Sequence, residues 1–182
     1  QKNDDRWRCR CEGTSCEETT SLANHVSGHT DLTREEFQLY YVPALLTHLS
    51  RRREGVEVTF VVGGADGCDK MTQLFLAEHG AHFTVFDKGT QRNIYPIGAT
   101  DVKHVNGFNS YPERDAAMTA ASDVDIAFLS QYAGAGSGTA ANLFRRQFGD
   151  QVSKQILEII RNNSMPFDKD AKKRLNGNDV SK

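Results

Sequence analysis

The feature that most constrains the fold is an apolar strand that stops on glycines and is followed by a helix and a second strand. Residues 56–62 are almost all apolar and rich in β-branched side chains, and they end at Gly63 and Gly64. This composition is typical of a central strand covered on both faces. Residues 69–79 carry apolar side chains at helical spacing, and residues 82–86 form another strand pattern. The succession predicts a βαβ unit with parallel strands.

The same theme extends on both sides of this unit. Residues 22–27 predict a first strand, and Thr33 with Glu36 predicts a capping box at the start of the next helix, which Pro43 kinks. The second half of the chain predicts a helix that begins at Ser110 and ends near Ser122, a strand over 123–129, and helices over 139–148 and 151–161.

Between these elements, residues 87–109 show no periodicity, and we expect a long loop that borders the functional site. The alternation of strands and helices predicts one Rossmann-like α/β domain over residues 21–162, in three α/β/α layers with a mainly parallel sheet. Residues 1–20 and 163–182 are polar and lack periodicity. We expect a flexible N-terminal extension and a C-terminal tail there.

Composition narrows the range of partners. The chain has 182 residues, a formal net charge of −2 and scattered basic residues, so we expect no nucleic-acid partner, although a small anionic ligand remains possible. No run of about 18 apolar residues and no secretion signal is present, which predicts no membrane partner and a cytoplasmic location.

Three of the four cysteines lie in the polar N-terminal stretch. Cys9, Cys11 and Cys16 lack the paired C-x2-C spacing of a zinc ribbon, so we expect reduced thiols and no metal, with a metal site as the less favoured alternative. Cys68 lies inside a glycine-rich turn, where a small side chain filling space explains it. We expect no cofactor.

Two glycine-rich turns follow predicted strands, GGADGCD at residues 63–69 and GAGSGT at residues 134–139. Glycine allows positive φ and lets backbone N–H groups approach a phosphate. Because the carboxyl ends of parallel strands share one edge, these turns should converge on one crevice. The alternative is a tight connection without a ligand, and Asp69 could simply favour the helix N-terminus. The candidate ligand-binding residues are Gly28, His29, Gly63, Gly64, Gly67, Asp69, Gly136, Ser137, Gly138 and Thr139.

Neither turn matches a common nucleotide-binding fingerprint. GGADGCD is not G-x-G-x-x-G, and no Gly-Lys-Ser/Thr triplet follows either turn. A classical dehydrogenase and a P-loop ATPase are therefore disfavoured.

These residues resemble the SLOG superfamily, which includes the LOG phosphoribohydrolases and the DprA-type DNA-processing proteins. The resemblance covers about residues 21–149. The strand and turn at 123–139 are also distantly similar to nucleoside 2-deoxyribosyltransferases. The resemblance rests on Ser27, Gly28 and His29, on GGADGCD, on Pro112, Glu113, Arg114, Asp115 and Met118, and on Gly136, Ser137, Gly138 and Thr139.

The resemblance implies a nucleotide or phosphorylated sugar as ligand, and it implies catalytic candidates. Arg114 matches an arginine of the LOG enzymes, and Glu113 beside it is a further acid, although Glu113 also fits a capping box with Ser110. Asn142 stands where both related enzyme groups carry a catalytic glutamate. An amide cannot form a glycosyl ester.

Three functions therefore remain open. The first is nucleotide binding without catalysis, and the second is hydrolysis or transfer at the N-glycosidic bond of a nucleoside monophosphate. The third is an interaction module with an empty crevice. The resemblance also implies a homodimer, formed through the helices near 111–121 and 139–160.

Overall fold

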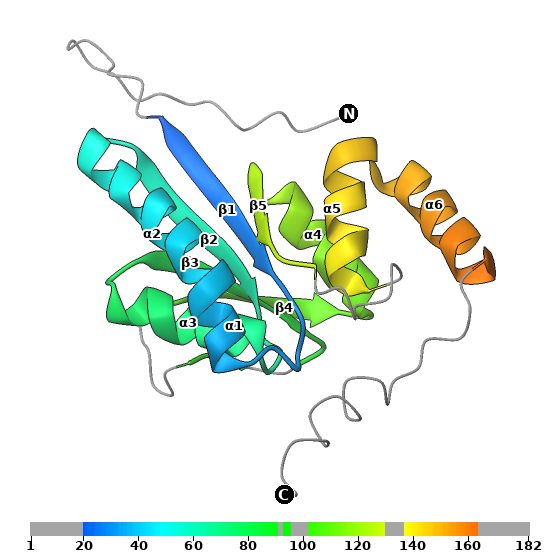
Figure 1. Ribbon diagram of the computed structural model, residues 1–182, viewed down its shortest axis with the longest axis horizontal. Helices are drawn as coiled ribbons and strands as arrows, with labels where there is room; N and C mark the ends of the chain where they lie inside the picture. Colours follow the sequence, from blue (N-terminus) through cyan, green and yellow to red (C-terminus); the bar gives the residue numbers. More distant parts are fainter. Residues whose placement is uncertain (1–19, 91–92, 96–101, 130–136, 164–182) are drawn as a thin grey trace, which may run out of the picture.

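The computed structural model describes residues 20–90, 93–95, 102–129 and 137–163. Within them, five parallel strands form one sheet in the spatial order β4-β3-β2-β1-β5 (Figure 1). The predicted Rossmann-like α/β fold with a parallel sheet is confirmed. The strands are β1 (Ser21–Ser27), β2 (Glu57–Gly63), β3 (His82–Lys88), β4 (Lys103–Phe108) and β5 (Val124–Ala127).

Helices cover both faces of this sheet and complete three layers (Figure 1). On one face, α3 contacts the three central strands and packs beside α1, which contacts α2. On the other face, α4 contacts β3 and β4, α5 contacts β5, and α6 packs on α5. The helices are α1 (Arg34–Tyr40), α2 (Val42–Ser50), the 3-10 helix η1 (Arg51–Glu54), α3 (Cys68–Glu78), α4 (Tyr111–Ala120), α5 (Gly138–Phe148) and α6 (Asp150–Asn163). No helix in the described ranges has the length and apolar character needed to cross a membrane.

The apolar side chains divide between the two faces because successive strand residues point to opposite sides. Val26 and Phe60 belong to the larger core beneath α1, α2 and α3. Val61, Phe86 and Met118 form a smaller core beneath α4. His25 and Ser27, which alternate with Val26 along β1, are buried polar side chains that point to this second face.

The predicted loop over residues 87–109 is wrong in part, because it contains the edge strand β4. Strand β4 has the sequence KHVNGF, is only half-buried and pairs with β3 alone. Polar edge strands lack the apolar run that identifies central strands, so hydrogen bonding to a neighbour rather than local sequence defines them. Gly107 adopts a positive φ of 93° near a shift in the strand register.

The predicted kink at Pro43 is a complete break between α1 and α2, with Tyr41 between them. Proline lacks the backbone N–H that would continue the helical hydrogen bonds, and it lies in the first turn of α2, where that N–H is not needed. The capping box of Thr33 and Glu36 is confirmed at the start of α1.

The strand order positions one edge of the sheet for ligand binding. From β1 the chain moves outward through β2 and β3 to β4, and it then returns to place β5 on the other side of β1. The carboxyl ends of β1 and β5 therefore flank the point where the strand order reverses. Ligands of open α/β sheets bind at such switch points.

Candidate functional site

A cleft of about 390 Å³ lies at the carboxyl end of β1, between the turns that follow β1 and β2 and the helices α4 and α5. An adjoining hollow of about 330 Å³ shares Thr30, Ala65, Tyr111 and Arg114 with it and extends toward β3. The turns after several strands do converge on one edge of the sheet. The cleft is lined by His25, Val26, Ser27, Gly28, His29 and Thr30, by Ala65 and Asp69, by Tyr111, Arg114, Asp115 and Met118, and by Gly138, Thr139 and Asn142.

The turn after β1 is held by a buried tyrosine. The Tyr41 hydroxyl donates to the carbonyl oxygen of Ser27 at 3.0 Å and accepts from the N–H of Phe128 at 3.1 Å. Gly28 is required here, because a Cβ would collide with the Tyr41 hydroxyl and lie 2.6 Å from Cys68 Sγ. Burial raises the pKa of Cys68 to about 12, so the thiol stays neutral. Tyr41 thus ties the ends of both strands of the switch point together.

The second glycine turn supplies a helix N-terminus to the cleft. Ser137 is the N-cap of α5, and its hydroxyl accepts a hydrogen bond from the N–H of Ala140 at 3.3 Å. Gly138 and Thr139 occupy the first turn and line the cleft. N–H groups in the first turn of a helix lack intrahelical acceptors, and such a turn attracts anions. Gly136, a further predicted contact, lies outside the described residues.

The first glycine turn is packed against carboxylates. A Cβ on Gly63 would collide with the Asp69 carboxylate, and one on Gly64 would collide with that of Asp87. Gly67 has a positive φ of 73° and approaches the backbone of Thr30. These glycines do not line the cleft itself, and packing alone explains why each is a glycine. The nearby carboxylates oppose a phosphate at this turn, so the second turn is the better anion site.

Arg114 and two carboxyl groups form a charged cluster in the cleft wall. Arg114 donates two hydrogen bonds to Asp115 Oδ1, from Nη2 at 2.6 Å and from Nε at 2.9 Å. Asp69 accepts from the N–H of Ala65 at 3.2 Å. Burial raises the pKa of Asp69 to about 7, although Arg114 opposes the shift. Asp69 can therefore give or take a proton near neutral pH.

Of the other two predicted catalytic residues, Asn142 lines the cleft and Glu113 does not. Glu113 does not line the cleft: its backbone N–H donates to the Ser110 hydroxyl at 3.3 Å, and its carboxylate accepts from the N–H of Asn109 at 2.9 Å. The expected capping box is wrong in this detail, because the carboxylate reaches the residue before the N-cap. Asn142 is buried and lines the cleft, but its oxygen accepts from Arg145 Nη1 at 2.7 Å. His29 lines the cleft as predicted.

Sequence reasoning missed a polar row on the floor of this region. His25 of β1 is buried, and its Nδ1 lies 2.9 Å from Asp125 Oδ1 of β5. Arg146 of α5 donates to the other Asp125 oxygen at 2.9 Å. The available signal was local: both strands place an ionisable residue at a position where a parallel strand usually carries an apolar one. Their pairing depends on residues 100 positions apart.

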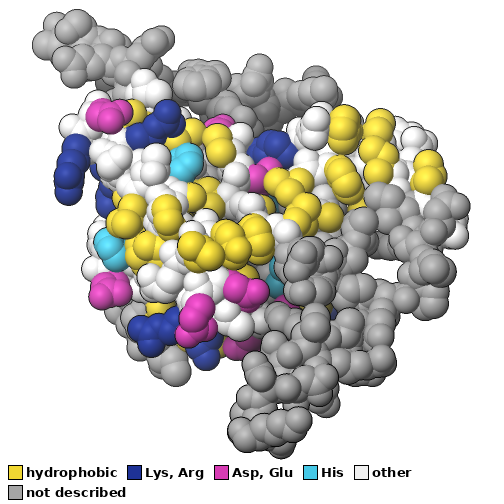
Figure 2. All heavy atoms as spheres, viewed as in Figure 1, with side chains coloured by type: hydrophobic (Ala, Val, Ile, Leu, Met, Phe, Trp, Pro, Cys, Tyr) yellow, Lys and Arg dark blue, Asp and Glu magenta, His cyan; other side chains and the backbone are white. Residues whose placement is uncertain are grey.

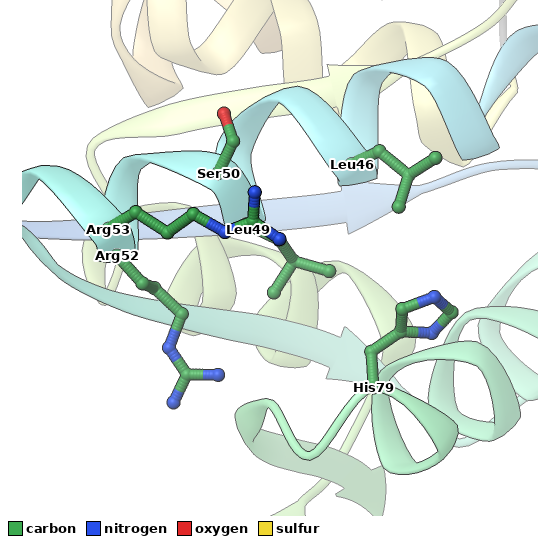
Figure 3. A pocket seen from close by; sticks show the side chains of 6 residues that line it. All are labelled: Leu46, Leu49, Ser50, Arg52, Arg53 and His79. Carbon is green, nitrogen blue, oxygen red and sulfur yellow. The ribbon is translucent and has the colours of Figure 1, made fainter.

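A larger hollow, of about 590 Å³, lies elsewhere, between the end of α2, η1 and the end of α3 (Figure 3). Arg52 and His79 stand at its two ends, and Leu49 lies between them. This hollow is at the amino ends of the strands, and Arg52 donates to the carbonyl oxygen of Gly80. Its polar lining comes from the ends of α2 and α3 and from η1, without a glycine turn or the first turn of a helix, so it is a weaker candidate than the smaller cleft.

Neither a metal site nor a similar known protein assigns a further role to the residues of the cleft. In the part of the chain that the structure describes, no group of three or more His, Cys, Asp or Glu side chains could hold a metal ion. Cys9, Cys11 and Cys16 lie outside that part. No family model matches the chain, and neither a curated protein nor a solved structure gives a significant match.

Proposed function

We propose that this chain binds a nucleotide or another phosphorylated sugar in the cleft between the carboxyl end of β1 and the first turn of α5. The observation that carries the proposal is the presence, at the switch point of the sheet, of a helix N-terminus, a close glycine turn and Arg114 in one cleft. Helix N-termini and guanidinium groups both favour phosphate. Membership of the SLOG superfamily is part of the same proposal.

In this proposal, the phosphate lies at the first turn of α5, against the N–H groups of Gly138 and Thr139. The sugar extends toward the turn after β1. Arg114 is partly neutralised by Asp115, so it contributes directional hydrogen bonds more than net charge. The carboxylates near the first glycine turn keep the phosphate on the α5 side.

Isothermal titration calorimetry with AMP, ribose 5-phosphate and adenosine tests this function. We expect both phosphorylated probes to bind and adenosine to bind more weakly. Gly138→Ala should bind AMP at least about tenfold more weakly, the equivalent of ~1.4 kcal/mol. Its fold should persist, because the new Cβ meets only Asp115 Oδ2, at 3.6 Å. Ser50→Thr, which adds a methyl group at an exposed position of α2, is the control.

Wild-type protein that binds none of these probes, or a Gly138→Ala variant that binds AMP as wild type does, contradicts the proposal.

A second candidate is hydrolysis of the N-glycosidic bond, and one observation favours it: Asp69, with its raised pKa, lies in the same cleft as Arg114. A protonated carboxyl group can donate its proton to a departing base. Asn142 cannot supply the carboxylate that the related enzymes use. We therefore infer that any such activity depends on Asp69.

Release of free adenine from AMP, followed by chromatography, tests this candidate. We expect Asp69→Asn to abolish release and Asp66→Asn to leave it unchanged, since Asp66 is an exposed acid of the same turn. Wild-type protein that binds AMP and releases no adenine would leave binding as the function.

We also propose a homodimer and a cytoplasmic location. Support for the dimer comes from the exposed apolar side chains of Phe148, Val152 and Ile159 on α5 and α6. Figure 2 shows hydrophobic side chains gathered over this part of the molecule. Exposed apolar patches often mark protein interfaces.

A further inference from the structure

A row of side chains, buried on the strands and half-buried on α5, links β1, β5 and α5 beneath the cleft. His25 is fully buried, and its Nδ1 lies 2.9 Å from Asp125 Oδ1, at a contact distance but not at an ideal hydrogen-bonding angle. Arg146 Nε donates to Asp125 Oδ2 at 2.9 Å, and its Nη2 lies 3.3 Å from Oδ1. The Asp125 carboxylate thus lies between an imidazole and a guanidinium.

The polar groups of Asp125 and Arg146 are hydrogen-bonded within the protein. Arg146 also donates to the backbone carbonyl oxygens of Thr119 and Ser122 and to the Ser122 hydroxyl. Burial raises the pKa of Asp125, but its interactions with His25 and Arg146 outweigh burial and lower it. The carboxylate is therefore ionised near neutral pH. It favours the tautomer of His25 that carries its proton on Nδ1.

The other side of the imidazole has no partner. His25 Nε2 makes no hydrogen bond in the described part of the chain, although the ring lines the cleft. Ser27 Oγ, two residues further along the same strand face, is also buried without a partner and also lines the cleft. A buried polar group left unpaired destabilises the folded state, so such groups call for a partner. Asn24 Oδ1 and His48 Nδ1 are unpaired too, but neither residue lines the cleft.

We propose that His25 is a ligand-contacting residue whose Nε2 accepts a hydrogen bond from a sugar hydroxyl in the cleft. With the proton on Nδ1 facing Asp125, Nε2 is an acceptor and needs a donor. A hydroxyl donates, whereas a phosphate oxygen does not. The inference rests on the proposed function and sharpens its ligand class: the sugar lies on His25 and Ser27, and the phosphate lies at α5.

The arrangement is not a Ser-His-Asp nucleophilic triad. Such a triad needs a hydrogen bond between serine Oγ and histidine Nε2. Ser27 and His25 are alternate residues of one strand, about 7 Å apart along it, and neither Ser27 Oγ nor His25 Nε2 has a partner among the described residues. Binding of the ligand through both groups is the simpler use of this geometry.

The variant His25→Asn tests the inference, because the asparagine amide can still face Asp125 while the cleft-facing nitrogen is lost. Calorimetry would compare AMP with its 2′-deoxy and 3′-deoxy forms. We expect His25→Asn to bind AMP about tenfold more weakly than wild type. For the deoxy form that lacks the contacted hydroxyl, wild type and variant should bind equally. The control, His82→Asn, changes an exposed histidine of β3.

A second measurement needs no variant. Long-range ¹H–¹⁵N correlation spectra of the wild-type protein should show the His25 proton on Nδ1, and added AMP should shift the Nε2 resonance. A proton on Nε2, an unmoved Nε2 resonance with AMP bound, or equal AMP affinity of His25→Asn and wild type overturns the inference while nucleotide binding stands. Failure of AMP and both deoxy forms to bind wild type overturns both.

Discussion

At the scale of single residues, glycines and carboxylates are packed together around the edge of the cleft. Gly63 and Gly64 leave room for the carboxylates of Asp69 and Asp87. The Asp87 carboxylate is held in turn by the N–H of Asn93 at 2.8 Å and lies 2.9 Å from His104 Nε2. Gly138, in contrast, faces open space apart from Asp115. Glycines of the two turns should therefore respond differently to substitution.

Gly64→Ala should destabilise the protein by about 1–3 kcal/mol, the usual cost of overpacking a filled site. The new methyl group would collide with Asp87 Oδ1 and lie 2.9 Å from Asn93 Cβ. Gly138→Ala should change the free energy of unfolding by less than about 1 kcal/mol. Urea denaturation monitored by circular dichroism measures both. Equal losses in the two variants would contradict this account of the turns.

Asp69 should make stability fall as pH rises. Its pKa is about 7 in the folded protein and 3.8 as the reference value, so the folded state holds a proton that the unfolded state releases. The contribution is fully present below about pH 4 and is lost as pH rises through about 7. Between about pH 5 and pH 8, wild type should lose more stability than Asp69→Asn does.

Denaturation at both pH values, with Asp66→Asn as the control, measures this difference. A carbon-13 titration of the Asp69 carboxyl gives its pKa directly, and an ordinary aspartate value there would refute the prediction.

At the scale of elements, α1 and α5 each begin with a hydroxyl N-cap, and only that of α5 adjoins the cleft. Thr33 caps α1 at an exposed position, and Ser137 caps α5 at the cleft. Both hydroxyls accept from a backbone N–H three residues further along the chain. Comparing variants of these two caps therefore distinguishes the effect of a cap on stability from its effect on ligand binding.

Thr33→Ala and Ser137→Ala should each cost about 1 kcal/mol of stability, because each leaves a helix N–H without its acceptor. Only Ser137→Ala should also weaken AMP binding, since the first turn of α5 would lose its fixed geometry. Thermal unfolding and calorimetry on both variants measure the two effects. Equal AMP affinities of the two variants would argue against a ligand at α5.

Tyr41→Phe should loosen the junction between β1 and β5. The hydroxyl bonds to Ser27 and Phe128, so its removal leaves a buried carbonyl oxygen and an N–H unpaired, at about 1–3 kcal/mol. Hydrogen exchange at the Phe128 amide should accelerate, while amides of α1 should change less. Tyr40→Phe, which removes the hydroxyl of a neighbouring tyrosine and keeps the ring that stacks on Phe128, is the control. Unchanged exchange at Phe128 would be evidence against the junction.

At the scale of the whole molecule, helix α6 extends the fold beyond the sheet. Helix α6 packs on α5, with Ser153 and Leu157 buried. Its exposed side chains include Val152 and Ile159. A second copy of the chain would cover this apolar surface.

Val152→Glu should dissociate the proposed dimer into monomers, because it places a charge on the apolar face of α6. Gln151→Glu adds the same charge at the neighbouring exposed position and should leave the dimer intact. Sedimentation velocity at several concentrations distinguishes these states. Monomeric wild-type protein at all concentrations would exclude the homodimer.

Local patterns were enough to predict most elements. The apolar run of β2, the cap of α1 at Thr33 and the cap of α4 at Ser110 depend on residues within a few positions of one another. Part of the cleft followed from the same patterns, since Gly28, Gly138 and Thr139 lie just after strands or at helix starts. The polar strand β4 was missed because its pairing with β3 defines it.

The sequence alone therefore determined the fold class and the edge of the sheet at which the turns meet, because hydrophobic periodicity, caps and glycines act locally. Tertiary structure decided which side chains share that edge. The contact of His25 with Asp125 and the burial of Asp69 beside Arg114 depend on strand order and helix packing. Only the assembled sheet brings such distant residues together, and only burial raises the pKa of Asp69 and leaves Nε2 of His25 without a partner among the described residues.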